Sequence, residues 1–267
     1  MKNLLITVFF SLAINFIDIA PVQAAKKGFD ELRSEHFVVK YEEGVNIDYV
    51  LKVKDIAEKY YRSITQEFNL IRDKLWLWDN RAKIFIAKDK GSYLENFDCS
   101  GWSAACVDYQ HKIIYTYYGQ ANFSSIFAHE LTHIIFREYI RKTKLPLWLD
   151  EGMATYIEDK YGSGKYRAEL RPLRRSVTKG KYIRFPELVR VSARELAYKP
   201  ADYVNLFYIQ SFSIVNFIIE EYQQYNFSNF LHHLGNGYEV EEALAKAYYQ
   251  LKNLEELEKR WKRFYRE

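Results

Sequence analysis

The sequence of 267 residues lacks several features that mark specialised protein classes. It has only two cysteines, and it contains no internal repeat and no low-complexity linker. Its formal net charge of +4 is small for its length and gives no support for binding to nucleic acid. We therefore expect no nucleic-acid partner, and we expect a solvated surface on one large domain or on two tightly joined lobes.

The first 24 residues are typical of a secretory signal peptide. Lys2 gives a short basic start, a mostly apolar run extends from Leu4 to Ile17, and Val22-Gln23-Ala24 fits a cleavage site with small residues. We therefore predict a signal peptide over residues 1–24. The mature chain, residues 25–267, is expected to be exported to the periplasm or the exterior of a bacterium.

The apolar run of this leader is short for a membrane helix. Asp18 and Pro21 end it before it reaches the length of a comfortable span, although an uncleaved anchor is the alternative. A lipoprotein is not expected, because no cysteine follows the run. We therefore expect no stable membrane span once the leader is removed.

The two cysteines, Cys99 and Cys106, lie close together in the sequence. In an oxidising compartment, a pair at this spacing favours a disulfide, with two free thiols as the alternative. A second zinc site that includes His111 is less expected, because the spacing matches no common zinc site. On the chain-entropy model, closing so short a loop would stabilise the fold by about 2–3 kcal/mol.

The segment Ala128–Phe136 contains the pattern His-Glu-x-x-His within a run that has the apolar spacing of a helix. Residues four apart lie on one helical face, so the imidazoles of His129 and His133 can converge on one Zn²⁺ ion. The carboxylate of Glu130 can then face a metal-bound water instead of the metal. The alternative interpretation is a pair of ordinary core or surface histidines on a helix.

A second segment, Pro146–Tyr156, can supply the third zinc ligand that this pair needs. A proline before an apolar and aromatic run marks the start of a helix, and Glu151 lies near that start. A hairpin of two antiparallel helices could return Glu151 to the metal, and the small residues Gly152 and Ala154 permit close helix packing beside it. Two histidines and one glutamate leave an open position, which is typical of catalytic and not of structural zinc sites.

Together, His129-Glu130-x-x-His133 and Trp148-Leu149-x-Glu151-Gly152-x-Ala154 resemble the gluzincin metallopeptidases, in particular the peptidase MA-like group. The resemblance implies one zinc ion with His129, His133 and Glu151 as its ligands and Glu130 as the general base. Large aminopeptidases of this clan also carry a Gly-x-Met-x-Asn segment that captures the substrate N-terminus. The chain has no such segment, which favours an endopeptidase.

The segments before the zinc motif have the patterns of a small sheet with one helix. Strands are predicted over residues 35–41, 82–87 and 112–118, and helical spacing is found over residues 47–70. The resemblance implies that residues 113–118 form the edge of the sheet beside the substrate cleft, where an extended peptide can add as a strand. An ordinary strand without substrate contact is the alternative.

The expected fold class is α+β and zincin-like. A small N-terminal mixed sheet with a helix forms a lobe over about residues 30–138, and a mainly helical lobe follows over about residues 139–267. The resemblance makes residues 25–267 one peptidase MA-like catalytic domain with the zinc between the lobes.

The helix expected over residues 203–222 contains Tyr208-Ile209-Gln210-Ser211, and similar segments occur in the peptidase MA-like group. By this resemblance we nominate the hydroxyl of Tyr208 as a donor that stabilises the oxyanion of a tetrahedral intermediate, with Tyr203 as the runner-up. Simple helix packing is the alternative for Tyr208, because the chain contains 23 tyrosines.

The segment of residues 161–181 is polar and basic. A run of this kind usually forms a solvated face, and binding to an acidic substrate or to the anionic envelope is the alternative.

The predicted function is that of a zinc-dependent metallopeptidase, in which zinc activates a water that attacks a peptide bond. The expected partner is a peptide or protein substrate, and the sequence gives no indication of oligomeric state. Two alternatives stay open: a zinc amidase that acts on cell-wall peptides, and a non-catalytic envelope-binding module that is stabilised by zinc.

Overall fold

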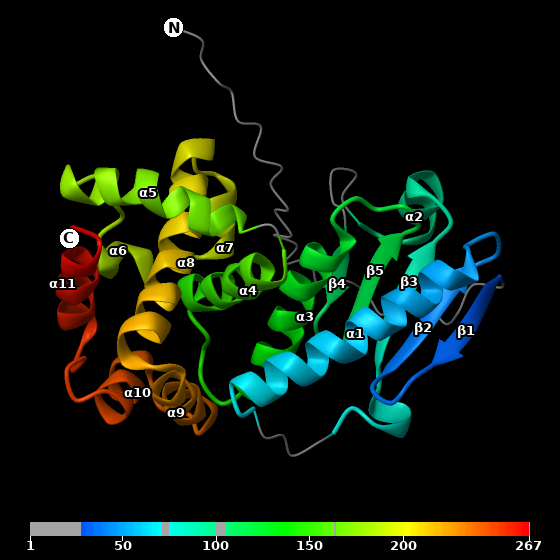
Figure 1. The fold of residues 1–267 in the computed structure, drawn as a ribbon, viewed down its shortest axis with the longest axis horizontal. Coiled ribbons are helices and arrows are strands. Elements are labelled where there is room, and N and C mark those ends of the chain that lie inside the picture. Colours follow the sequence, from blue (N-terminus) through cyan, green and yellow to red (C-terminus); the bar gives the residue numbers. More distant parts are fainter. Residues whose placement is uncertain (1–27, 71–74, 100–104, 163, 267) are drawn as a thin grey trace, which may run out of the picture.

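The structure is a computed structural model that describes residues 28–70, 75–99, 105–162 and 164–266. The predicted signal peptide, residues 1–24, lies outside these described residues. An N-terminal sheet with its helices lies beside a larger helical part (Figure 1). The predicted α+β class, with a small mixed sheet followed by a mainly helical half, is confirmed.

The sheet has five strands in the order β1-β2-β3-β5-β4. The three central strands are parallel, and an antiparallel strand lies at each edge. The bounds in chain order are β1 (Phe29–Arg33), β2 (Phe37–Glu42), β3 (Ala82–Ala87), β4 (Cys106–Asp108) and β5 (Ile113–Tyr117).

The prediction that residues 113–118 form the sheet edge is wrong. The short strand β4 covers β5, with Val107 opposite Ile114 and Asp108 opposite Ile113 in antiparallel register. The edge nearest the motif helix is therefore β4, which has only three residues and too little alternation to be recognised in the sequence.

Helices cover both faces of the sheet. On one face, Val39, Ile84 and Ile114 join the main core together with α1 (Ile47–Glu67) and α3 (Phe123–Tyr139). On the other face, α2 (Lys90–Asn96) and the residue after it pack on Phe85 and Tyr115. Strands β3 and β5 are thus buried on both sides, which explains their nearly continuous apolar character.

The helical part follows α3 in the chain. A short 3-10 helix, η1 (Trp78–Asn80), precedes β3 in the sheet part. The remaining helices are α4 (Leu147–Tyr161), α5 (Lys165–Thr178), α6 (Phe185–Leu188), α7 (Ala193–Ala197), α8 (Ala201–Tyr222), α9 (Gln224–Gly235), α10 (Val240–Ala247) and α11 (Leu254–Phe264). Among the described residues, no helix combines the length and the apolar character that crossing a membrane requires.

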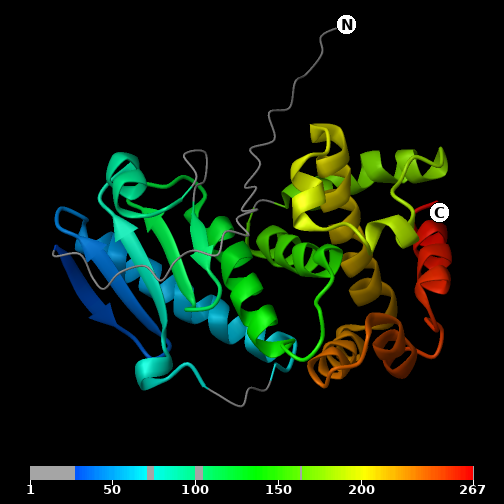
Figure 2. The same cartoon turned by 180° about the vertical axis from the view of Figure 1, so that it is seen from behind.

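Helix α8 is the central helix of this part, and α4 and α9 pack directly against it (Figure 2). Two of its buried polar side chains, Gln210 and Ser213, form hydrogen bonds to neighbouring segments. The Gln210 side chain donates to the carbonyl of Ile183 and accepts from the same residue's N–H, at 2.7 and 2.8 Å. Ser213 accepts a hydrogen bond from the indole N–H of Trp261 at 3.0 Å. These polar residues therefore connect α8 to its neighbours.

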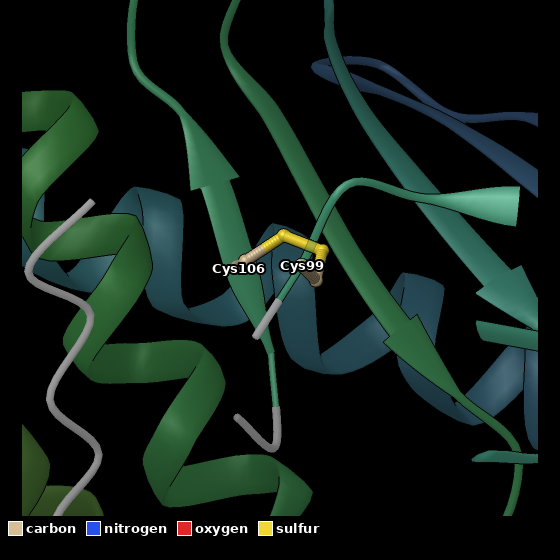
Figure 3. The surroundings of a disulfide bond; sticks show 2 residues. All are labelled: Cys99 and Cys106. Carbon is tan, nitrogen blue, oxygen red and sulfur yellow. A yellow bond between two sulfur atoms is a disulfide. The ribbon is translucent and has the colours of Figure 1, made fainter. Parts of the chain in front are cut away.

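A disulfide joins Cys99 to Cys106, and it ties the segment after α2 to the first residue of β4 (Figure 3). The predicted disulfide is confirmed, and it leaves no thiolate for the alternative second zinc site. His111 instead pairs through Nδ1 with Asp108 Oδ2 at 2.7 Å, which braces the turn between β4 and β5.

Candidate metal centre

Two helices bring the three predicted ligands together. His129 and His133 lie one turn apart on α3, and Glu151 lies in the second turn of α4. The contacts run in opposite directions along the two helices, since His129 meets Glu158 and His133 meets Asp150, as expected for the predicted antiparallel hairpin. Glu151 reaches both imidazoles from α4.

The donor atoms of these residues form a small buried triangle. His129 Nε2 lies 3.2 Å from His133 Nε2, and Glu151 Oε2 lies 3.6 Å from each of these nitrogens. The three residues are 6%, 2% and 8% exposed. Tetrahedral zinc with ligands at about 2.0–2.1 Å separates its ligand atoms by about 3.3 Å. The triangle therefore has the size that one zinc ion requires.

Each imidazole is oriented by a carboxylate on its other side. His129 Nδ1 lies 2.9 Å from Glu158 Oε2, and His133 Nδ1 lies 2.8 Å from Asp150 Oδ1. A carboxylate at Nδ1 holds the proton there and leaves Nε2 as the lone-pair donor that faces the centre of the triangle. Helix α4 thus supplies one candidate ligand and both orienting carboxylates.

Arg137 holds Asp150 in its ionised form. Its Nε and Nη2 donate to Asp150 Oδ2 at 2.9 and 2.6 Å, and its guanidinium lies 3.9 Å from the ring centroid of Tyr109. Burial raises the pKa of Asp150, but the charges of His133 and Arg137 lower it by more, so that the net shift is downward. The acceptor for His133 therefore remains a carboxylate.

The candidate general base, Glu130, is fully buried. Neither of its carboxylate oxygens has a hydrogen-bond partner among the described residues, and burial raises its pKa. Burying a carboxylate without a hydrogen-bond partner costs free energy, so the presence of Glu130 beside the triangle needs a chemical reason. A water that is polarised by a metal at the triangle gives that carboxylate both a partner and a proton to accept.

The charges around the triangle favour a cation at its centre. Burial lowers the pKa of His133, but Asp150 and Glu151 raise it by more, to about 9. Burial raises the pKa of Glu151, whereas His133 and His129 lower it well below the usual range of a glutamate. The same carboxylates that attract protons to the imidazoles would attract a divalent cation that replaces those protons.

Tyrosines from separate elements surround this centre. Burial raises the pKa of Tyr208 on α8, and the charges of Glu151 and Glu130 raise it further. The hydroxyl of Tyr203 instead donates to Glu187 at 2.8 Å. Of the two nominated tyrosines, Tyr203 is thus engaged with Glu187, and Tyr208 is the one influenced by the charges of Glu151 and Glu130.

The sequence-based predictions missed two further tyrosines at the site. The ring of Tyr109, in the turn after β4, lies 5.9 Å from the ring of His133. The pKa of Tyr166 on α5 is raised by burial and by its interactions with Glu158, which orients His129. Neither tyrosine carries a spacing signal, because tertiary packing alone brings it to the centre.

The orienting residues did carry such a signal. Arg137 lies four residues after His133, and Glu158 lies seven residues after Glu151. Both intervals put the second residue on the same helical face as the first, so helical spacing could have identified Arg137 and Glu158 as neighbours of the candidate ligands.

Comparison with known protein families identifies the family of the chain. A family model described as the Peptidase MA superfamily matches residues 114–267, which extend from β5 to the end of the chain. This range covers more than half of the sequence and contains His129, Glu130, His133 and Glu151. No curated protein matches the chain.

Proposed function

Because the chain belongs to the Peptidase MA superfamily, we propose that it is a zinc-dependent metallopeptidase of the gluzincin type. Family membership alone supports a metallopeptidase-like function with a peptide or protein substrate. The finer proposal, one zinc ion held by His129, His133 and Glu151, rests on one observation. Their donor atoms form a buried triangle with the spacing of tetrahedral zinc ligands.

The proposed mechanism assigns proton transfer to Glu130. Zinc bound at the triangle would lower the pKa of a water towards about 7 and polarise the substrate carbonyl. Glu130 takes the proton of the water as the oxygen attacks the carbonyl carbon, and it then delivers the proton to the leaving amine. Tyr208 donates a hydrogen bond to the oxyanion of the tetrahedral intermediate.

The proposal extends to processing and location. We propose removal of residues 1–24 and action of the mature chain, residues 25–267, in the periplasm or outside the cell. The disulfide between Cys99 and Cys106 supports this location, because disulfides persist in oxidising compartments. The division into lobes over about residues 30–138 and 139–267 is part of the same proposal.

The decisive experiment separates metal binding from catalysis. We expect purified wild-type protein to contain one zinc ion and to cleave a mixed peptide library that includes cell-wall peptides. Glu130→Gln should keep its zinc and lose cleavage by about 10²-fold or more, because the base is removed while the triangle stays intact. Glu95→Gln, which neutralises an exposed glutamate on α2, is the matched control and should cleave normally.

The products of this library also separate the alternatives. Internal cleavage of long peptides supports an endopeptidase, which we propose because the chain lacks a Gly-x-Met-x-Asn segment. Cleavage of cell-wall peptides alone would favour the amidase. Zinc binding without any hydrolysis would refute the peptidase and favour a binding module.

Two substitutions test the other assignments. Glu151→Ala should lose zinc at neutral pH, and full zinc occupancy in this variant would refute its role as third ligand. Tyr208→Phe should lower kcat by about 10²-fold with little change in zinc content, because one oxyanion donor is removed. Tyr203→Phe is its matched control, since the Tyr203 hydroxyl is bonded to Glu187, and equal losses in both variants would refute the assignment to Tyr208.

A further inference from the structure

Positive charge is concentrated in one part of the chain. Between Lys165 and Lys199 the sequence has eleven Lys or Arg residues and only three Glu, which gives this segment a net charge of +8. The whole chain carries +4, so all other residues together carry −4. The segment comprises α5, α6, α7 and their connections, so the small net charge of the chain conceals a strongly basic region.

On α5 these charges form a continuous row. Arg167, Arg171, Arg175 and Lys179 follow one another at intervals of four residues, and all four are exposed. Such intervals keep the side chains on one face of the helix over about 18 Å, at about 1.5 Å per residue. The opposite face buries Leu173 and Val177 in the core. We call these four residues the basic row.

The basic row lies on an outward helix and is largely unpaired. Figure 1 shows α5 along the outer edge of the helical part, with its C-terminal end standing clear of α8. Arg167 forms an ion pair with Asp159 at 3.4 Å. Within the described ranges, no acidic side chain forms an ion pair with Arg171, Arg175 or Lys179.

A second exposed helix shows that such a row is not general in this protein. On α1, the exposed face carries Asp48, Lys52, Asp55 and Lys59, which alternate in sign. An ordinary solvated face has this mixed character. The basic row instead presents cations of one sign along a convex helix, a shape that matches a flat anionic surface better than it encloses a peptide.

We propose that the basic row docks the protein on a lipid bilayer with anionic headgroups. Each Lys or Arg side chain near such a surface strengthens binding about fivefold, so that several in a row add to a stable attachment. The row begins directly after Tyr166, whose neighbour Glu158 orients His129. Docking through the row therefore holds the candidate metal centre beside the membrane surface.

The test is co-sedimentation with lipid vesicles. One set contains phosphatidylcholine alone, and the other contains phosphatidylcholine and the anionic phosphatidylglycerol in equal parts. We expect wild-type protein to bind the anionic set preferentially and to be released in roughly 1 M salt, where the Debye length falls to about 3 Å. Arg171→Glu/Arg175→Glu/Lys179→Glu should lower the partition coefficient by about 100-fold or more.

The matched control reverses three exposed lysines elsewhere, in Lys52→Glu/Lys59→Glu/Lys90→Glu. It changes the net charge by the same amount, and we expect it to lower the partition coefficient less than about fivefold. All variants keep the N-terminus of the wild type, so any contribution of residues 1–24 cancels. Circular dichroism checks folding, and the corresponding triple glutamine variant of the basic row replaces the glutamate variant if that one is unfolded.

Three results would overturn the proposal. The first is equal binding of wild-type protein to neutral and anionic vesicles, or binding to neither. The second is an equal loss in the basic-row variant and the control, which would indicate dependence on net charge alone. The third is binding to a polyglutamate peptide without binding to anionic vesicles, which would identify an acidic polypeptide as the partner.

Discussion

Gly152 offers the sharpest test of how the candidate metal centre is held in place. It follows Glu151 on α4, at the crossing of α4 with α8. A Cβ atom at this position would lie 2.7 Å from the carbonyl oxygen of Ser211 and 2.9 Å from Val215 Cγ2. Real Cβ atoms essentially never make contacts this short, so Gly152→Ala requires the two helices to move apart.

The size of the effect follows from two opposed terms. Replacing glycine by alanine inside a helix normally stabilises a protein by about 0.5–1 kcal/mol. Overpacking costs about 1–3 kcal/mol, and here the obstructing atom is a backbone carbonyl that cannot rotate away. We therefore expect Gly152→Ala to lower the free energy of unfolding by about 1–2 kcal/mol.

The same movement should weaken metal binding. Moving α4 displaces Glu151 from His129 and His133, and a site of this kind tolerates only about 0.5 Å of misplacement. We expect the zinc affinity of Gly152→Ala to fall about tenfold or more, because residues that position a metal ligand without touching the metal have effects of this size. Urea unfolding gives the stability, and competition with a chromophoric chelator gives the zinc affinity.

A double-mutant cycle with Val215→Ala supplies the control. Truncating Val215 removes one of the two obstructing groups, so the double variant should be more stable than the sum of the single effects predicts. Retention of full zinc affinity and wild-type stability in Gly152→Ala would refute the claim that the α4–α8 crossing fixes Glu151.

Two further predictions concern hydrogen bonds made by buried carboxylates. Asp150→Asn should bind zinc about 10–100-fold more weakly in the chelator assay, because it no longer holds the proton on Nδ1 of His133, and unchanged affinity would contradict that role. Burial raises the pKa of Glu258, but hydrogen bonds from the Phe185 N–H and the Tyr182 hydroxyl lower it by more. The stabilisation by this carboxylate is therefore complete above the unfolded pKa of about 4.3, and it is lost as pH falls through the lower pKa of the folded state. In urea unfolding, the stability difference between wild type and Glu258→Gln should therefore shrink below about pH 4. A difference that stays constant down to pH values near 3 would contradict this assignment.

The long elements could be predicted from the sequence, because apolar periodicity records which face each one buries. The bounds predicted for β3 are those observed, and the predicted helix over residues 47–70 corresponds to α1. Strands β1 and β4 escaped prediction, because they are short and show too little alternation of apolar and polar residues. That omission led to the wrong edge strand, since β5 could not be recognised as an interior strand without β4.

The candidate ligands could also be predicted, whereas most of their surroundings could not. Helical spacing within α3 joins His129 to His133, and the resemblance supplied Glu151. The hydrogen bond from His129 to Glu158 connects two helices, so it depends on the angle and position of their crossing. Tyr109 arrives from a turn of the sheet, and no local pattern in the sequence describes that approach.

The arrangement of carboxylates on α4 explains why the matched family range can contain the whole centre. Three carboxylates of this helix contact the imidazoles of α3: Asp150 contacts His133, Glu158 contacts His129, and Glu151 approaches both. Helix α8 packs against α4 at Gly152. Each of these elements falls within residues 114–267. The sheet strands before this range therefore are not needed to supply a ligand, and their contribution is the edge strand β4 and the ring of Tyr109 that covers His133. Changes in β4 should accordingly lower zinc affinity less than changes in α3 or α4, which distinguishes the role of the sheet from that of the helices.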